Sequence, residues 1–94
     1  MQNQIKKLKE ELQKDFPRNE MKLTLFPSGA VMLDIGIGPE TYVLEYHQNV
    51  GLGINRMSKA TFGWEGYEYP FEDLEAAKSF LVSIFKKNEP TSQP

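Results

Sequence analysis

The chain has 94 residues and a formal net charge of −2, and this length suits one domain with a modest hydrophobic core. It contains no cysteine, so disulfide bonds and thiolate metal ligands are excluded. Its apolar runs are only a few residues long, so neither a membrane span nor a signal peptide is predicted. Lys and Arg do not cluster with aromatic residues, which argues against nucleic-acid binding. We therefore expect a soluble, cytoplasmic protein without a cofactor.

The N-terminal segment has the spacing of an amphipathic helix that ends before Pro17. Its apolar residues recur at helical spacing, with Lys and Glu between them, at Ile5, Leu8, Leu12 and Phe16. Asn3 is a candidate N-cap, and Pro17 disfavours helical geometry at the residue before it. One narrow apolar stripe of this kind is typical of a helix that covers a sheet.

Residues 21–57 alternate between apolar and polar side chains, which is the pattern of half-buried strands. They predict four strands, at residues 21–26, 30–37, 42–47 and 52–57. The connections between them are short and rich in turn residues, which favours antiparallel neighbours in a meander. The expected core face carries Leu23, Val31, Leu33, Ile35, Tyr42, Leu44 and Ile54.

A second amphipathic helix is predicted to begin near Asp73 and to stop at Asn88. Its acidic residues lie in the first turn and Lys86 and Lys87 in the last, which suits the helix macrodipole. Residues 1–88 then form a single α+β domain, and residues 89–94 a disordered tail. We predict a four- to five-stranded antiparallel meander with both helices on one face, because each helix has one apolar stripe to bury.

The segment from Phe62 to Tyr69 combines four aromatic residues with two glycines and lies among acids. Trp and Tyr are favoured anchors of protein interfaces, and the acids suit a partner with a basic surface. We therefore predict that this segment, a loop or a short edge strand, binds another protein. The alternative is that its rings fold onto the sheet edge and extend the core. The predicted partner-binding residues are Phe62, Trp64, Glu65, Tyr67, Glu68 and Tyr69.

The single histidine, His47, lies on the polar face of the third predicted strand together with Glu45. Asp34 is expected across from His47 on the second strand, so the three side chains could bind a metal or move protons. This face is the alternative site, that of a small-molecule binder or an enzyme. Plain alternation on a solvated face produces the same trio, and zinc needs three or four converging ligands, so no metal site is predicted.

The sheet face opposite the helices is expected to mix polar side chains with Phe26, Ala30, Met32, Val43 and Met57. Such a mixture is usual for a face that is open to water. A contiguous patch of Phe26, Met32 and Val43 would instead indicate a homodimer or a partner surface.

Several segments of the chain resemble small uncharacterised bacterial proteins of helix–sheet–helix type. They are Phe26-Pro27-Ser28-Gly29-Ala30, Leu33-Asp34, Tyr42-Val43-Leu44-Glu45-Tyr46 and Phe71-Glu72-Asp73-Leu74-Glu75-Ala76-Ala77. In size and in its acidic loop the chain is also similar, by architectural analogy, to the immunity proteins of bacterial toxin systems. The resemblance implies no activity. The favoured function is non-catalytic protein binding, as a regulatory or toxin-neutralising subunit.

Overall fold

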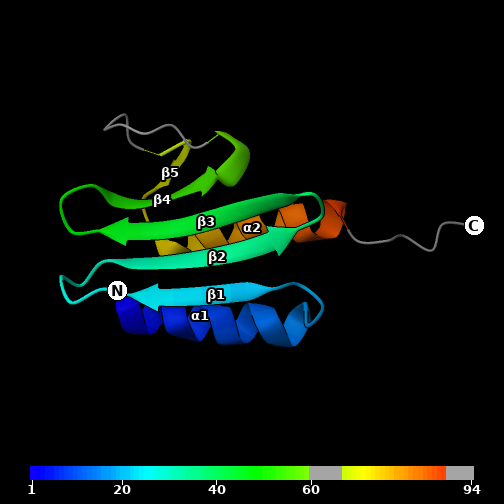
Figure 1. Cartoon of the computed structure of the whole chain (residues 1–94), viewed down its shortest axis with the longest axis horizontal. Helices are drawn as coiled ribbons and strands as arrows, with labels where there is room; N and C mark the ends of the chain where they lie inside the picture. Colours follow the sequence, from blue (N-terminus) through cyan, green and yellow to red (C-terminus); the bar gives the residue numbers. More distant parts are fainter. Residues whose placement is uncertain (60–66, 89–94) are drawn as a thin grey trace, which may run out of the picture.

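The chain folds as a helix, a five-stranded antiparallel sheet and a second helix (Figure 1). A computed structural model describes residues 1–59 and 67–88. The elements are α1 (Gln2–Asp15), β1 (Met21–Leu25), β2 (Val31–Ile37), β3 (Glu40–His47), β4 (Gly51–Arg56), the 3-10 turn η1 (Met57–Lys59), β5 (Tyr69–Phe71) and α2 (Leu74–Lys87).

The strands lie in chain order, β1-β2-β3-β4-β5, and each pairs antiparallel with the next. The predicted meander is therefore confirmed, and β5 makes it five-stranded. The hairpin turns that lead into β2 and β4 contain Gly29 and Gly51, with φ values of +95° and +96°. Glycine adopts this left-handed conformation without steric cost, so these turns suit their sequences.

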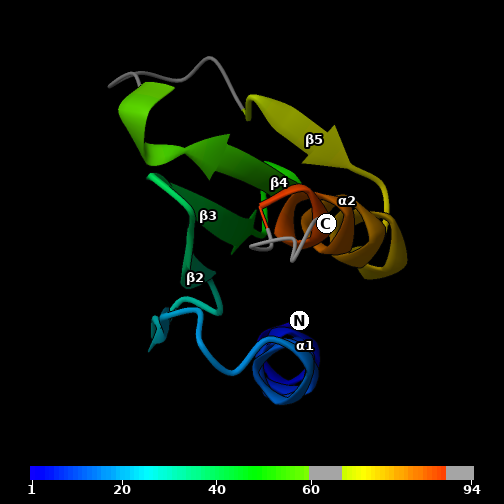
Figure 2. The same cartoon turned by 90° about the vertical axis from the view of Figure 1, so that its right-hand side faces the viewer.

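Both helices cover the same face of the sheet, as predicted (Figure 2). The core is a single cluster between the helices and the alternating positions of the strands. At one end of it the rings of Phe16 and Phe85 stack with centroids 4.2 Å apart, which joins the end of α1 to α2. The fully buried large side chains are Ile5, Leu12, Val31, Leu33, Ile35, Ile37, Leu44, Ile54 and Leu81.

The helix ends follow the sequence signals at three of four positions. Asp73 caps α2, because its Oδ1 accepts a hydrogen bond of 2.8 Å from the Ala76 N–H, and Asn88 is the C-cap. α1 ends at Asp15, as expected from Pro17. The prediction that Asn3 caps α1 is wrong: Met1 is the N-cap and makes no side-chain hydrogen bond.

Gln2, the first residue of α1, instead ties the helix to the first hairpin. Its Nε2 donates to the carbonyl oxygens of Phe26 and Ala30, at 2.8 and 2.9 Å. These bonds hold the start of the chain against the β1–β2 turn. They are contacts between residues distant in sequence, which local capping patterns do not reveal.

The first four strands differ from the predicted ranges by one or two residues at their ends. β3 begins at Glu40, because Glu40 pairs with Ile37 across a two-residue turn. β5 lies at Tyr69–Phe71, at the end of the predicted aromatic segment. The predicted tail lies outside the described residues. Within the described part of the chain, no helix is long and apolar enough to cross a membrane.

Candidate functional site

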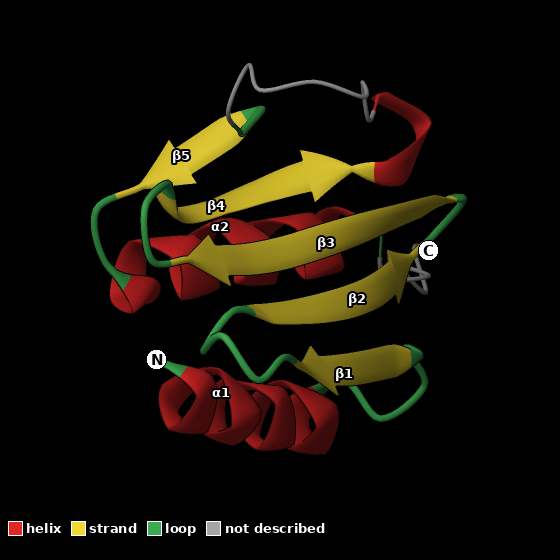
Figure 3. Ribbon diagram, turned by 60° about the vertical axis from the view of Figure 1, so that its left-hand side comes forward, coloured by secondary structure: helices red, strands yellow, loops and turns green. Residues whose placement is uncertain are grey.

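The sheet face turned away from α1 and α2 is here called the open face (Figure 3). By strand alternation it carries the predicted alternative-site residues Asp34, Glu45 and His47. Strand register arranges its side chains in rows across the sheet. One row runs Lys22, Asp34, Val43 and Asn55, and the next runs Thr24, Met32, Glu45 and Gly53. The open face is polar, with Val43 buried between its neighbours.

The predicted partner-binding residues divide into two groups. Tyr67, Glu68 and Tyr69 are described, whereas Phe62, Trp64 and Glu65 lie outside the described residues. Over these three consecutive residues the chain passes from the open face, where Tyr67 lies, to the core side of the sheet, where Tyr69 lies. Each makes a different kind of contact.

Tyr67 lies across the open face, over Gly53 of β4. A Cβ atom built on Gly53 would overlap the Cβ and the nearest ring atoms of Tyr67, so the Tyr67 side chain occupies the space that a side chain at position 53 would need. The Tyr67 hydroxyl donates a 2.7 Å hydrogen bond to the carbonyl oxygen of Gly51. Glycine within a strand often marks such a close approach, so Gly53 was the sequence signal for this contact.

Burial raises the pKa of Tyr67 to about 12, with a smaller contribution from the negative charge of Glu45. The hydroxyl is therefore a hydrogen-bond donor throughout the physiological pH range.

This pKa predicts a loss of stability at alkaline pH. The folded-state pKa lies above that of an exposed tyrosine, about 10, so folding favours the neutral hydroxyl. The resulting stabilisation is complete below about pH 10 and is lost as the pH rises to about 12. Denaturant unfolding of the wild type and Tyr67→Phe should show a stability difference that shrinks over this interval. A difference that stays constant with pH would contradict the assignment.

Glu68, the residue after Tyr67, holds the chain against the end of β4. Its carboxylate accepts hydrogen bonds from the Arg56 guanidinium, with Nε 3.1 Å from both oxygens, and this pairing raises the pKa of Arg56. The Glu68 N–H donates to Asn55 Oδ1 at 2.7 Å. Because the ion pair is partly exposed, its electrostatic contribution to stability is small, and it mainly sets position.

Tyr69 belongs to the core side of the sheet. Its ring packs against the ring of Phe80 in α2, with centroids 4.6 Å apart. The ring of Phe71 also packs against Phe80, at a centroid distance of 5.4 Å. For Tyr69 the structure shows the alternative that the sequence left open, a ring that extends the core at the sheet edge.

Glu45 and His47 are joined on the open face in a hydrogen-bonded chain. His47 Nε2 donates to Glu45 Oε1 at 3.0 Å, and Asn55 Nδ2 donates to Glu45 Oε2 at 3.2 Å. The Asn55 side chain also accepts a hydrogen bond from the Glu68 N–H. These hydrogen bonds therefore link the predicted alternative site to the predicted partner-binding segment. Sequence patterns did not reveal Asn55, since its role depends on strand register.

The expected position of Asp34 across from His47 is wrong. The two-residue turn between β2 and β3 places Asp34 opposite Val43, and Glu45 opposite Met32. Asp34 is therefore one row away from the Glu45–His47 pair. In the part of the chain that the structure describes, no group of three or more His, Asp or Glu side chains could hold a metal ion.

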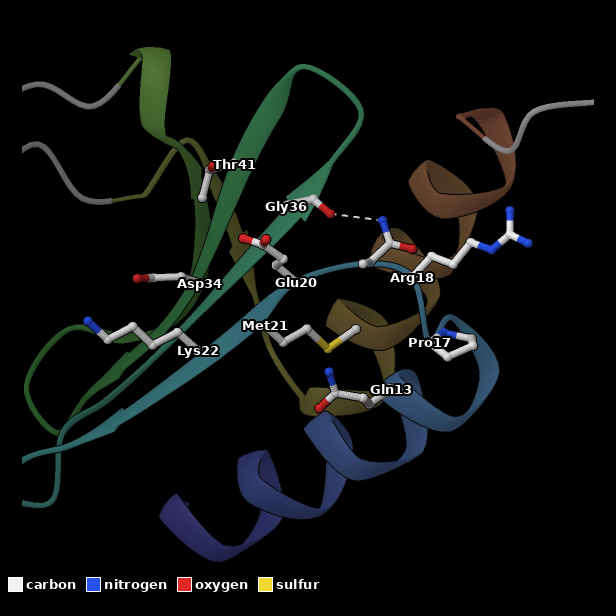
Figure 4. Close-up of a pocket in the computed structure, with 10 residues that line it drawn as sticks. Gln13, Pro17, Arg18, Glu20, Met21, Lys22, Asp34, Gly36 and Thr41 are labelled. Carbon is white, nitrogen blue, oxygen red and sulfur yellow. Dashed lines mark hydrogen bonds between the residues drawn. The ribbon is translucent and has the colours of Figure 1, made fainter.

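Asp34 instead lines a hollow of about 500 Å³ beside Gly36 (Figure 4). Asn19 Nδ2 donates to the Gly36 carbonyl oxygen at 2.8 Å and closes one side. Asp34 Oδ1 is buried and is the one buried side-chain oxygen or nitrogen of the described residues without a hydrogen-bond partner. The residues that line the hollow carry charges of both signs: Arg18 and Lys22 are basic, and Glu20 and Asp34 are acidic.

The exposed apolar side chains gather at one end of the sheet. This hairpin end, defined here as Met1, Phe26 and Val50, comprises the start of α1 and the turns that follow β1 and β3 (Figure 1). The three residues are 38%, 37% and 53% exposed. Leu25, 49% exposed, precedes Phe26 on β1, and Met57 lies at the opposite end of β4.

The residues of the predicted dimer face are unequally accessible. Val43 is only 3% exposed, Met32 is half-buried between Thr24 and Glu45 in its row, and Phe26 lies in the turn after β1. A homodimer through this face remains a prediction.

No protein-family model, curated protein or solved structure matches this chain. Function is therefore inferred from the fold and the side chains alone.

Proposed function

We propose that this chain is a non-catalytic protein-binding module that docks its partner through the hairpin end. The observation that carries the proposal is the grouping of Met1, Phe26 and Val50, each more than a third exposed, at one end of the sheet. Exposed apolar residues scattered singly need no explanation, whereas several at one place mark interaction surfaces. Met and aromatic residues are also enriched in interface cores.

The surroundings of the hairpin end suit an interface rim. Ser28, Gln48 and Asn49 lie in the same two turns, are exposed and carry no charge. Glu72 and Asp73 are exposed on the connection between β5 and α2, which leaves the sheet at this end because Phe71 pairs with Leu52. The fitting partner has an apolar centre bordered on one side by basic residues.

The hairpin that carries Val50 is held in place by several contacts. The Val50 N–H donates to the His47 carbonyl oxygen at 3.0 Å, and Gly51 receives the Tyr67 hydroxyl. A surface that is already rigid loses little conformational entropy on binding. A regulatory or toxin-neutralising subunit is a role of this kind, because it acts by occupying a surface of its partner.

Placing a charge at the hairpin end should abolish partner binding without unfolding the protein. Val50→Asp puts a carboxylate on the most exposed apolar residue of the hairpin end, where desolvating it on binding is costly. Loss of an interface anchor typically costs about 2 kcal/mol or more, roughly a thirtyfold fall in affinity. The measurement is quantitative mass spectrometry of proteins retained from a lysate of the source organism by the tagged wild type and the variant.

Met57→Asp is the matched control, because Met57 is 51% exposed but lies away from the hairpin end. Proteins retained by the wild type and by Met57→Asp but lost from Val50→Asp would support the proposal. Equal loss from both variants, or from neither, would refute it. Melting temperatures of the two variants should stay near that of the wild type, because neither residue is in the core.

A further inference from the structure

The two edges of the sheet are protected to different degrees. β5 is only three residues long and has Pro70 at its centre, which removes a backbone donor from that edge. β1 has five residues, contains no proline, and pairs with β2 without a bulge. An open edge of this kind offers unpaired backbone groups to another strand.

The register shows which backbone groups of β1 point outward. The Phe26 N–H donates to the Ala30 carbonyl and the Gly36 N–H donates to the Glu20 carbonyl, so the even-numbered residues of β1 bond to β2. The N–H and C=O groups of Met21, Leu23 and Leu25 therefore point away from the sheet. None of the described residues hydrogen-bonds to them across this edge.

α1 does not close this edge. It packs against both β1 and β2 from the covered face, and Figure 1 shows it alongside β1 at the outer margin of the sheet, where it makes none of the hydrogen bonds that another strand would make. Leu25, half-exposed on that face, is left at the margin of the core.

The side chains of β1 are complementary to a second, antiparallel copy of β1. With Leu23 opposite Leu23 of the other copy, Met21 faces Leu25, and all three pairs are apolar and lie on the helix-covered face. On the open face Lys22 faces Thr24, so no like charges stand directly opposite each other. Three hydrogen-bonded pairs that exchange two bonds each would give six inter-strand hydrogen bonds.

We propose that two copies of this chain associate through their β1 edges, in antiparallel register centred on Leu23. The two-fold axis is perpendicular to the sheet, so both sheets join into one and all helices stay on the same face. Leu25 of each copy becomes covered by Met21 of the other. This interface differs from the hairpin end and from the predicted Phe26, Met32 and Val43 face, so it goes beyond the proposed function.

The test is sedimentation velocity of the full chain over a wide concentration range, with two substitutions at Thr24. Thr24→Lys places two like-charge pairs with Lys22 across the interface, and Thr24→Glu places two opposite-charge pairs. One cross-strand pair changes the free energy by about 0.2–1 kcal/mol, so two should shift the dimer Kd by roughly twofold to thirtyfold. We expect Thr24→Lys to raise the Kd and Thr24→Glu to lower it at low ionic strength.

Leu25→Pro is the second variant. Its N–H points outward and takes no part in the β1–β2 ladder, so proline should be tolerated in the monomer and block pairing at the edge. We expect a folded monomer by circular dichroism and sedimentation.

A wild type that stays monomeric at near-millimolar concentration would overturn the proposal. So would a dimer that both Thr24 variants leave unchanged or shift in the same direction. Val50→Asp should remain dimeric, so failure here and failure of the hairpin-end proposal are distinguishable.

Discussion

Replacing Leu33 with alanine is expected to cost about 2–5 kcal/mol of folding stability. Leu33 is completely buried and lies in β2, where it pairs with Leu23 on one side and Leu44 on the other. Removing its side chain loses the transfer free energy of the buried atoms and leaves a cavity. The neighbouring strands and helices can fill that cavity only in part, since protein interiors are closely packed.

Denaturant unfolding measures this loss, with Met32→Ala as the matched control. Met32 precedes Leu33 in the same strand but lies half-buried on the open face, so its truncation should cost much less. In a domain of this size each kcal/mol lowers the melting temperature by roughly 4–8 °C. Equal losses for the two variants would mean that the core does not lie on the Leu33 side of β2.

Replacing Gly53 with alanine is expected to destabilise the protein by about 1–3 kcal/mol, an effect of overpacking. Gly53 has no positive φ, so its backbone accommodates alanine without strain. The obstacle is the Tyr67 ring, which occupies the position of the new Cβ. The ring must move, and the hydrogen bond from its hydroxyl to Gly51 is then lost.

The sign of this effect should reverse when Tyr67 is absent. In a Tyr67→Gly background, which removes the Cβ as well as the ring of residue 67, all three of the nearest contacts of the added methyl group are gone, and alanine in a strand is about 0.5–1 kcal/mol better than glycine. The double-mutant cycle should therefore give a coupling energy of roughly 1.5–4 kcal/mol, the sum of the two changes.

Gly36→Ala provides the matched control on the same face. A Cβ at Gly36 would meet only the Glu20 carbonyl oxygen, at 3.9 Å, which is ordinary contact. We expect this variant to be neutral or slightly stabilising. Additive effects of Gly53→Ala and Tyr67→Gly would show that the Tyr67 side chain does not pack on Gly53 in solution.

Parts of the functional surface could be foreseen from single residues. Placement of Glu45 and His47 on the open face follows from alternation, since these polar residues alternate with the buried Leu44 and the half-buried Tyr46. Their link to Asn55 and Glu68 could not be foreseen, because it requires the β3–β4 register and the return of the chain at residue 67. The same holds for Asp34, which a two-residue turn moves into a different row.

The exposed hairpin end shows why composition alone could not locate the proposed docking surface. Phe26 comes directly after β1 and Val50 directly before β4. In the sequence both look like ordinary members of the apolar pattern of a strand. Their exposure depends on how far α1 and α2 extend beneath the sheet, which is a property of packing. Met1 joins them only because Gln2 binds the first turn.

The sequence by itself determined the order and type of α1, β1 to β4 and α2, and the face that each of them buries, whereas it left β5 open between a loop and a short edge strand. These properties rest on local causes: side-chain period, turn residues and helix caps act over a few positions, and nothing in the tertiary packing opposed them. The tertiary structure alone decided the strand register, the packing of Tyr67 against Gly53, the hollow beside Asp34 and the open edge of β1. Those features arise between residues far apart in the chain, where excluded volume and hydrogen-bond geometry select one arrangement among many that the local pattern permits.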